Sequence, residues 1–475
     1  MLSRLSASRR TFLKSSSSLA AAPFVGTLGA LQTRIAHAAG FSALVASPYG
    51  PIAPVNDLTT GLPLLKLPEG FSYKSYGWTG DMMNDGLATP GSHDGMGVIR
   101  SRRVGRSSEM VLVRNHERGN SSSPILNVPT YDNVFNVPTS GSPTRPGGGT
   151  SNLVFRDGNW VSSFASLAGT LVNCAGGVTP WGTWLTCEET ISNRATGLNG
   201  PVGLKHGYVF EVPVDAAMTN PQPIVGMGRL VHEACAVDPR TGFVYETEDN
   251  RNASGFYRYV PNVVLGAPGT LEQGGRLFGA KVVGVNNADL NVANVGDTYQ
   301  LEWVEISNPD ADPQIRTNFP GFGSTANATG TAAMSGPFAL GWDAGCLRMS
   351  RGEGIWYWNR KMYIVDTATG LENRASPPPR FGRGDGAVWE LDLDTQMLTC
   401  IFAVPQNASS VGNNPDNVTV SPKGGILLCE DGGTFSAAGQ TFGARMMGLN
   451  LDGDAWAFAE NNLTPAVVAA SVAQG

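Results

Sequence analysis

Short apolar runs that end in acidic or polar residues recur along this chain. Five of them, EMVLVRNHE, GTWLTCEE, GFVYETED, KMYIVDT and GGILLCED, end at Glu117, Glu189, Asp249, Thr367 and Asp431. Three are preceded by an apolar stretch and a Pro-containing turn closed by Gly, in CAGGVTPWG, ACAVDPRTG and NVTVSPKGG. A strand, such a turn and a second strand form a β-hairpin. The pattern therefore predicts a series of antiparallel hairpins.

Tandem antiparallel units indicate an all-β fold of the β-propeller type. The acidic ends are irregularly spaced, often about sixty to seventy residues apart. These units are longer than the common propeller repeat of about forty residues, so we expect a six-bladed propeller with inserted loops. A β-sandwich is the alternative, although it would not require recurrent acidic strand ends. In a propeller the innermost strands surround one axis, so acidic residues far apart in the sequence would meet in one pocket.

Three of the segments end in a pair of acidic residues. Neighbouring residues on a strand point to opposite faces, so the two members of each pair cannot both point inward unless the strand ends there. The first acids are Glu188, Glu248 and Glu430, and the second acids are Glu189, Asp249 and Asp431. The pattern leaves open which member of each pair faces the axis.

Converging carboxylates repel one another, so they must be protonated, paired with cations or bound to metal. The local sequences are not rich in arginine, which favours metal. Carboxylates, Asn115, Asn417 and backbone carbonyls are hard ligands suited to calcium, whereas a thiolate favours a transition metal. Cys174 is the best placed thiol, because the Ala-Gly-Gly that follows it predicts a loop. A buried free thiol is the alternative for this residue.

Two further stretches contain candidate site residues. In RMSRGEG, Arg351 and Glu353 are two positions apart, so they project to the same face of an extended segment. An arginine fork can hold a phosphate through two hydrogen bonds, and Glu353 could bind a metal that polarises it. An exposed ion pair is the alternative. In SHDGMG, His93 and Asp94 are further candidate site residues. The alternative is a turn in which the Asp94 side chain hydrogen-bonds to its own backbone.

The N-terminus predicts export. Arg9 and Arg10 precede Phe12 and Leu13, and an Ala/Leu/Val stretch follows that closes on Ala36-His37-Ala38. This order is typical of a twin-arginine signal peptide, here residues 1–38, that engages the twin-arginine export machinery. Its apolar run is too short for a stable membrane anchor. We expect residues 39–475 to form one propeller domain that works in the periplasm or is secreted.

Composition narrows the function. Hydrophobic residues make up 41% of the chain, enough for a core, and 60 Gly and 31 Pro fit a fold rich in turns. The net charge of −6, without a basic run, argues against nucleic-acid binding. Five His are too few to favour a histidine-based metal centre. Six Cys scattered over a chain of this size do not require a disulfide scaffold, and five of them are expected to be small buried residues.

Several long motifs resemble the PhoX-type alkaline phosphatases. They are SHDGM, VRNHE, NCAGGVTPWGTWLTCEE, KHGYVFEV, HEACAVDPRTGFVYETED, FYRY, RGEGIW and PDNVTVSPKGGILLCEDG, which occur in this order between about Leu64 and Asp454. The resemblance implies an exported phosphatase that hydrolyses small phosphate monoesters. It also implies a β-propeller that carries a ferric iron pair together with calcium ions.

The same resemblance implies a role for individual residues. Cys174 matches a thiolate ligand of iron, and Arg351 matches the arginine that holds the phosphate. Glu189, Glu248 and Glu353 match carboxylates of the metal cluster, with Glu353 also assigned to catalysis. The expected calcium ligands are Asp249, Asp416, Glu430 and Asp431. The insert from Asn308 to Gly336 and the RMSRGEG stretch differ from the family pattern, and they could reshape the rim of the pocket.

Two other functions fit the same pattern. A calcium-dependent lactonase or esterase on a similar propeller would use the carboxylates without a thiolate or an oxyanion-binding arginine. A non-catalytic exported propeller would carry metals only for stability and bind a surface ligand. No convincing serine nucleophile motif is present, and a metal-assisted phosphatase does not need one.

Overall fold

The structure is a computed structural model, and it describes residues 22–120, 122–134, 145–192, 203–264, 266–325, 328–373, 378–437, 440–450, 452–465 and 467. Strands dominate this part of the chain. The helices are α2 (Ala22–Ala38) and α3 (Gly336–Asp343), with short 3₁₀ turns at Ala216–Met218, Val225–Met227 and Leu271–Gln273. Among the described residues, no helix is both long and apolar enough to cross a membrane.

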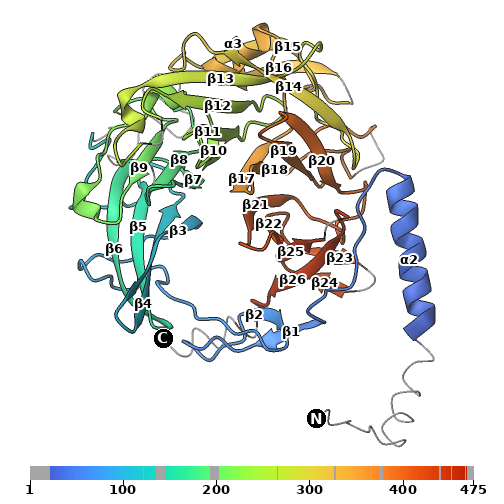
Figure 1. Ribbon diagram of the computed structural model, residues 1–475, viewed down its shortest axis with the longest axis horizontal. Coiled ribbons are helices and arrows are strands. Elements are labelled where there is room, and N and C mark those ends of the chain that lie inside the picture. The colour runs from blue at the N-terminus through green and yellow to red at the C-terminus, as the bar shows by residue number, and fades with distance from the viewer. Residues whose placement is uncertain are drawn as a thin grey trace, which may run out of the picture.

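Antiparallel sheets surround a central axis, and the first strand of each sheet is innermost (Figure 1). The first sheet contains β3 (His93–Val104), β4 (Ser107–His116), β5 (Gly148–Arg156) and β6 (Asn159–Thr170). The second contains β7 (Asn173–Val178), β8 (Trp184–Glu188) and β9 (Val209–Val212). The third contains β10 (His232–Val237), β11 (Val244–Glu248), β12 (Phe256–Pro261), β13 (Gly275–Val282) and β14 (Thr298–Glu305).

The fourth sheet contains β17 (Gly352–Trp358), β18 (Lys361–Asp366), β19 (Ala387–Asp392) and β20 (Met397–Ala403), and its outer strand pairs with β14 of the third. The fifth contains β21 (Pro415–Val420), β22 (Ile426–Glu430), β25 (Arg445–Leu449) and β26 (Ala455–Asn461). Two separate hairpins are β15 (Gln314–Pro320) with β16 (Thr329–Met334), and β23 (Phe435–Ala437) with β24 (Gln440–Phe442).

Strands from both ends of the chain share the fifth sheet. β2 (Leu65–Pro68) pairs with β26, and β1 (Ile52–Val55) continues the sheet outward. The Lys66 Nζ atom lies 2.7 Å from Glu460 Oε1 across this junction. The fifth sheet is therefore complete only when strands from both parts of the sequence are paired.

The all-β propeller expected from the sequence is confirmed, but its blade count is different. The described residues place five groups of strands around the axis and not six, and the third and fourth groups join through β14 and β20 into one nine-stranded sheet. The additional chain length lies between the third and fourth sheets, where β15, β16 and α3 follow β14. The five segments singled out in the sequence are β4, β8, β11, β18 and β22, the second strand of every sheet.

The hydrophobic core lies between neighbouring sheets. Ile99 and Val113 of the first sheet pack with Trp184 and Phe210 of the second. Similar clusters join the second sheet to the third, the third to the fourth and the fourth to the fifth. Within the described residues, no such cluster joins the fifth sheet to the first. The junction between these two sheets is therefore less tightly packed.

All six cysteines are free. Cys187, Cys235, Cys346 and Cys400 are buried, as expected for small apolar residues, whereas Cys429 is exposed on the fifth sheet. Cys174 is also buried, but it lies in strand β7 and not in the predicted loop. Because NCAGGV pairs with β8 across a register shift, the small residues after Cys174 form part of an irregular strand.

Candidate metal centre

One β-bulge recurs at the same place in all five sheets. The first residue of the inner strand pairs with the last residue of the second strand, as His93 does with His116. The next pair joins the residue three positions later on the inner strand to the residue two positions earlier on the second strand. The inner strand therefore contains one extra residue at this point, which is a β-bulge. The same shift occurs in the other four sheets, beginning at Asn173, His232, Gly352 and Pro415.

The residue that follows each of these positions is acidic or a thiol. These residues, here called the inner ring, are Asp94, Cys174, Glu233, Glu353 and Asp416. Each is the second residue of its inner strand, so the propeller presents one ligand-type side chain per sheet at the same end of the axis. The residue after each is small in four sheets, and a Cβ on Gly95 would lie 2.6 Å from the Ala175 Cα. Close packing at the axis explains why small residues occupy this position.

The ends of the second strands supply another group of polar residues. The residues one position beyond these strands, here called the outer ring, are Glu117, Glu189, Asp249, Thr367 and Asp431. The last residues of the strands themselves are His116, Glu188, Glu248, Asp366 and Glu430, and each is held by hydrogen bonds within its own region. The second member of each acidic pair therefore belongs to the site, and the first member supports the fold.

Two residues expected to bind metal, Glu248 and Glu430, have partners elsewhere in the fold. Glu248 accepts a hydrogen bond of 2.6 Å from the Tyr257 hydroxyl and one of 3.2 Å from the Gly255 amide. Glu430 forms a two-pronged ion pair with Arg445, at 2.6 and 2.7 Å. Neither carboxylate is among the converging ligand atoms of the described residues, and each follows the alternation of side chains along its strand.

Glu188 belongs to a buried charged group that stabilises the fold. His206 Nδ1 lies 2.6 Å from Glu188 Oε1, and its Nε2 lies 3.4 Å from Asp132 Oδ2. Burial alone would lower the pKa of His206, but the two carboxylates together raise this pKa to about 9. The histidine is therefore protonated in the folded protein at neutral pH.

This group predicts a pH-dependent stability. A histidine with a raised pKa stabilises the folded state fully below its unfolded pKa, about 6.5, and this stabilisation is lost as pH rises to about 9. In chemical denaturation, the stability difference between the wild type and a His206→Gln variant should shrink between pH 6.5 and 9.5. His232→Gln is the control, because the pKa of buried His232 is lowered to about 4 and this histidine stays neutral over that range. An unchanged difference for His206→Gln would contradict the prediction.

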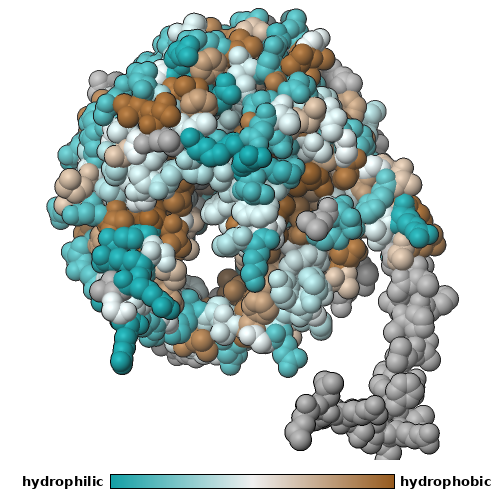
Figure 2. Space-filling view, viewed as in Figure 1, coloured by the Kyte–Doolittle hydropathy of each residue, from teal (hydrophilic) through white to brown (hydrophobic). Residues whose placement is uncertain are grey.

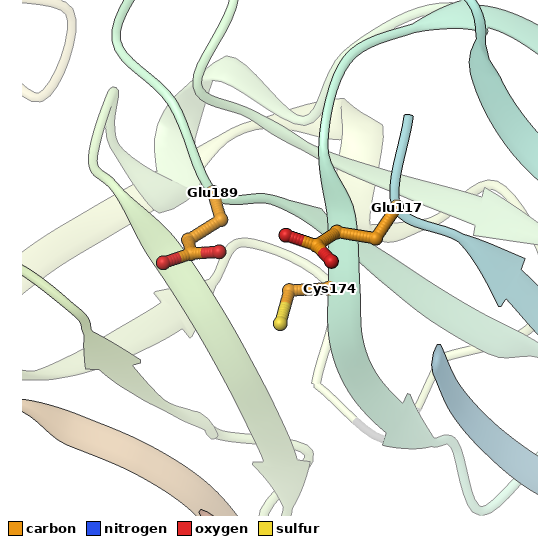
Figure 3. Close-up of side chains that lie close together, drawn as sticks. All are labelled: Glu117, Cys174 and Glu189. Atoms are coloured by element: carbon orange, nitrogen blue, oxygen red, sulfur yellow. The ribbon is translucent and has the colours of Figure 1, made fainter. Parts of the chain in front are cut away.

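The acidic residues and the thiol gather into two adjacent groups. One ligand atom each from Glu117, Cys174 and Glu189 lie within 4.8 Å of one another, and Figure 3 shows these side chains converging. One atom each from Glu233, Glu353 and Asp416 also lie within 4.8 Å of one another. The Cys174 Sγ atom is 3.3 Å from Glu233 Oε1, so the two groups are in contact.

The electrostatics of these groups are unfavourable without cations. Burial and then the neighbouring Asp249 raise the pKa of Glu189 to about 10, while burial and Glu353 raise the pKa of Glu233. Burial raises the pKa of Asp416 to about 7, with Asp431 as the next cause. Burial, then Asp416, raises the pKa of Asp94 to about 8, and burial with Glu233 raises the pKa of the Cys174 thiol.

Two buried carboxylate oxygens, Glu233 Oε2 and Glu353 Oε1, have no hydrogen-bond partner. Repelling carboxylates, a thiol and unpartnered oxygens together are a donor set that fits several metal ions. The carboxylates suit a hard cation such as calcium, and the thiol suits a transition metal such as iron.

Arg351 is the cation of the site. Its Nε atom donates to Asp249 Oδ1 at 2.6 Å, and its Nη2 atom donates to Asp249 Oδ2. Nη2 also lies 3.2 Å from Glu353 Oε1, although the alignment is not that of a hydrogen bond. Burial alone would lower the pKa of Arg351, but the Asp249 carboxylate raises this pKa above its ordinary value. Its side chain is 28% exposed, and no described residue hydrogen-bonds Nη1, so this edge can receive an anion.

Asn115 holds the inner ring in place through hydrogen bonds of its side chain. Its Nδ2 atom donates to the carbonyls of Cys174 and Ala175, at 3.0 and 2.8 Å. Its Oδ1 atom accepts hydrogen bonds of 2.9 Å from Trp184 and Thr186. Trp184 thus contributes to the position of the bulge that carries the thiol. Asn417 donates to Asp416 Oδ1 at 3.0 Å.

Most of the residues expected from the sequence come together. Cys174, Glu189, Glu353 and Asp416 belong to the two metal-ligand groups, and Arg351 with Asp249 adjoins them. Asp431 raises the pKa of Asp416 and of Glu117, which places it beside the same site. As expected, Arg351 and Glu353 project to the same side.

Sequence reasoning missed Glu117 and Glu233 as ligands and left Asp94 undecided. Glu117 ended one of the five recurrent segments, so that repeat already marked it. Glu233 could have been found by comparing the beginnings of the inner strands. HDG, NCA, HEA, GEG and PDN each place an acid or a thiol at the second position.

Comparisons with known proteins agree with this architecture. The profile of the family described as alkaline phosphatase PhoX matches residues 47–162 and 142–474. A solved structure titled Pseudomonas fluorescens PhoX in complex with vanadate, a transition state analogue, is similar to this chain with a TM-score of 0.57. Their sequences are 17% identical, and the match covers 89% of each chain. A search of curated proteins found no match.

Proposed function

Because the chain belongs to the alkaline phosphatase PhoX family, a family of phosphatases, we propose that it hydrolyses small phosphate monoesters at the inner and outer rings with iron and calcium ions. The observation that carries this proposal is the contact between the two ligand groups through Cys174 and Glu233, beside the Arg351 guanidinium. Charge neutralisation and positioning are most of what phosphoryl transfer asks of a protein.

Iron and calcium would bind to different residues of the site. Cys174, with Glu117 and Glu189, would hold iron, because the thiolate is the soft donor in that group. Calcium would bind to a set of carboxylates without a thiol, formed by Asp94, Asp416 and Asp431. When bound, these cations supply the Lewis acidity that neutralises phosphoryl charge and activates water.

Arg351 would bind and orient the phosphate. Asp249 holds the guanidinium from one side, so its orientation is set before the substrate arrives. The free Nη1 edge would donate to a phosphoryl oxygen, and this bond would strengthen as charge develops in the transition state. Glu353 lies beside the same guanidinium and would keep it next to the ligand groups.

Export through the twin-arginine pathway, to the periplasm or beyond, is also part of the proposal. Residues 1–21, with the paired arginines, lie outside the described residues. The following helix α2 stands outside the ring of sheets and ends at Ala38 (Figure 1). From Ser42 onward the backbone bonds to the sheets, as Ser42 does to Ala403 at 3.0 Å. Cleavage after Ala38 would therefore keep these backbone bonds and would remove the side-chain contact of 2.8 Å between His37 Nε2 and Asp454 Oδ1.

Hydrolysis of p-nitrophenyl phosphate by the purified protein, together with metal analysis, tests the proposal. We expect turnover that is lost on chelation, and bound iron as well as calcium. Calcium alone, with turnover of a lactone or carboxylic ester in place of the phosphate, would favour the lactonase. Bound metals without hydrolysis of any of these esters would favour the non-catalytic propeller that binds a surface ligand. Of the three functions, only the phosphatase needs both the thiol and Arg351.

Removing the metals should destabilise the protein more at high pH. Without metal, the acids with raised pKa values, such as Glu189 at about 10, stay protonated when folded but ionise on unfolding. Stability of the metal-free protein should then fall as pH rises from about 4 toward 10. We expect the drop in melting temperature on chelation to be larger at pH 9 than at pH 6. An equal drop at both pH values would show that these acids do not hold the metals.

A further inference from the structure

The ring of sheets is open between its first and last members. Successive inner strands pack against one another from β3 to β21, but no comparable contact returns from β21 to β3. A cavity of about 930 Å³ lies along the axis beside this opening, lined mostly by the first and fifth sheets and also by residues of the other three. Figure 2 shows an opening in the middle of the molecule with hydrophobic surface on both sides. The size is within the range of about 300–1,000 Å³ typical of small-molecule sites.

The walls of this cavity are apolar and its inner end is acidic. Met96, Val98 and Leu112 line the side of the first sheet, while Val418, Leu427 and Met446 line the side of the fifth. Met96 is 48% exposed and Val98 is 42% exposed, which is unusual for apolar residues on inner strands. These side chains would gain free energy if an apolar group covered them.

The cavity reaches the candidate metal centre. Asp94 and Asp416 belong to the inner ring and also line the cavity, one from each side of the opening. Asp431 of the outer ring lines it as well. A phosphoryl group held at the ring could therefore extend the rest of its ester into this space. None of the described residues that line the cavity is Lys or Arg, so nothing there would pair with a second anionic group.

We propose that this cavity binds the alcohol part of the substrate, and that the preferred substrates are phosphate monoesters of neutral, apolar alcohols. The inference rests on the proposed phosphatase function and adds the substrate class. Met96 and Met446 line the cavity from the first and fifth sheets with flexible side chains, so alcohols of different shapes can be accommodated. A sugar or polyol would place several hydroxyl groups against walls that are mostly apolar, where Asn417, Thr419 and Ser421 offer few partners.

Alkyl phosphates of increasing chain length test the proposal, because their leaving groups have similar pKa values. With the metal-loaded protein, kcat/KM should rise roughly tenfold or more from ethyl phosphate to hexyl phosphate, since each buried methylene adds affinity. Met96→Trp, which narrows the cavity, and Val98→Asp, which makes its wall polar, should each lower the ratio of hexyl to ethyl phosphate hydrolysis. Two variants are used so that a folding defect in one does not decide the result.

Matched controls lie elsewhere on the surface. Met218 is 73% exposed and Val161 is 44% exposed, and neither lines the cavity. Met218→Trp and Val161→Asp should leave the hexyl to ethyl ratio unchanged. Equal kcat/KM for the two esters, or a ratio that neither cavity variant alters, would overturn the inference while the phosphatase function stands. Hydrolysis of no ester by the metal-loaded protein would overturn both.

Discussion

Replacing Arg351 with alanine should lower kcat/KM for phosphate monoesters by about 10²–10³-fold, the usual cost of removing one preorganised donor. Arg351 is the cation in contact with both Asp249 and Glu353, and its Nη1 edge is available to an anion. Steady-state hydrolysis of p-nitrophenyl phosphate measures the effect. Inhibition by inorganic phosphate should weaken in parallel, because the same guanidinium would hold the product.

Two further variants separate phosphate binding from structural effects. Arg351→Lys keeps the charge but loses the fork, so its activity should lie between that of the wild type and that of the alanine variant. Arg360→Ala removes an arginine that is 61% exposed and pairs with Asp394, and it should have no effect on kcat/KM. Metal content must be unchanged in Arg351→Ala, since the loss of this cation also increases repulsion among the acids. Wild-type activity in a metal-replete alanine variant would exclude Arg351 from phosphate binding.

Replacing Cys174 with serine should remove iron and lower phosphatase activity by at least about 100-fold, because even the outer partners of metal ligands contribute 10–100-fold. Cys174 is the thiol that contacts Glu233 and groups with Glu117 and Glu189. A serine hydroxyl has nearly the same shape but is a poor ligand for a transition metal. Elemental analysis and p-nitrophenyl phosphate hydrolysis should change together.

Cys346→Ser is the matched control for this substitution. Cys346 is another buried free thiol, 5% exposed, in the region between β13 and α3 and outside the two ligand groups. This variant should keep its iron and its activity, with any loss confined to thermal stability. Full activity of Cys174→Ser with calcium but no iron would favour the lactonase or esterase alternative.

Local sequence carried much of the architecture. The apolar runs that end at Glu117, Glu189, Asp249, Thr367 and Asp431 predicted the second strands of all five sheets. Strand formation and hairpin turns depend on residues that are neighbours in the chain, so pattern alone reveals them. The number of sheets was less accessible, because inserted strands lengthen the chain without adding a sheet around the axis.

Side-chain direction at the axis required the tertiary structure. The sequence marked acidic pairs but not which acid faces inward, and in the structure Glu248 pairs with Tyr257 and Glu430 pairs with Arg445. Direction depends on the register between strands, and the recurrent bulge shifts that register by one residue in every sheet. No pattern within a single strand records this shift.

The sequence by itself determined the strands, the ligand-type residues at their ends and the kinship of the chain, since these depend on residue identity and order. Only the tertiary structure decided that Glu233 meets Cys174, that Arg351 is held by Asp249, and that a cavity opens between the first and last sheets. The contact of Glu233 with Cys174 joins residues 59 positions apart, and that of Arg351 with Asp249 joins residues 102 positions apart. They exist only once the sheets have packed around a common axis, because packing sets the distances between side chains from different sheets.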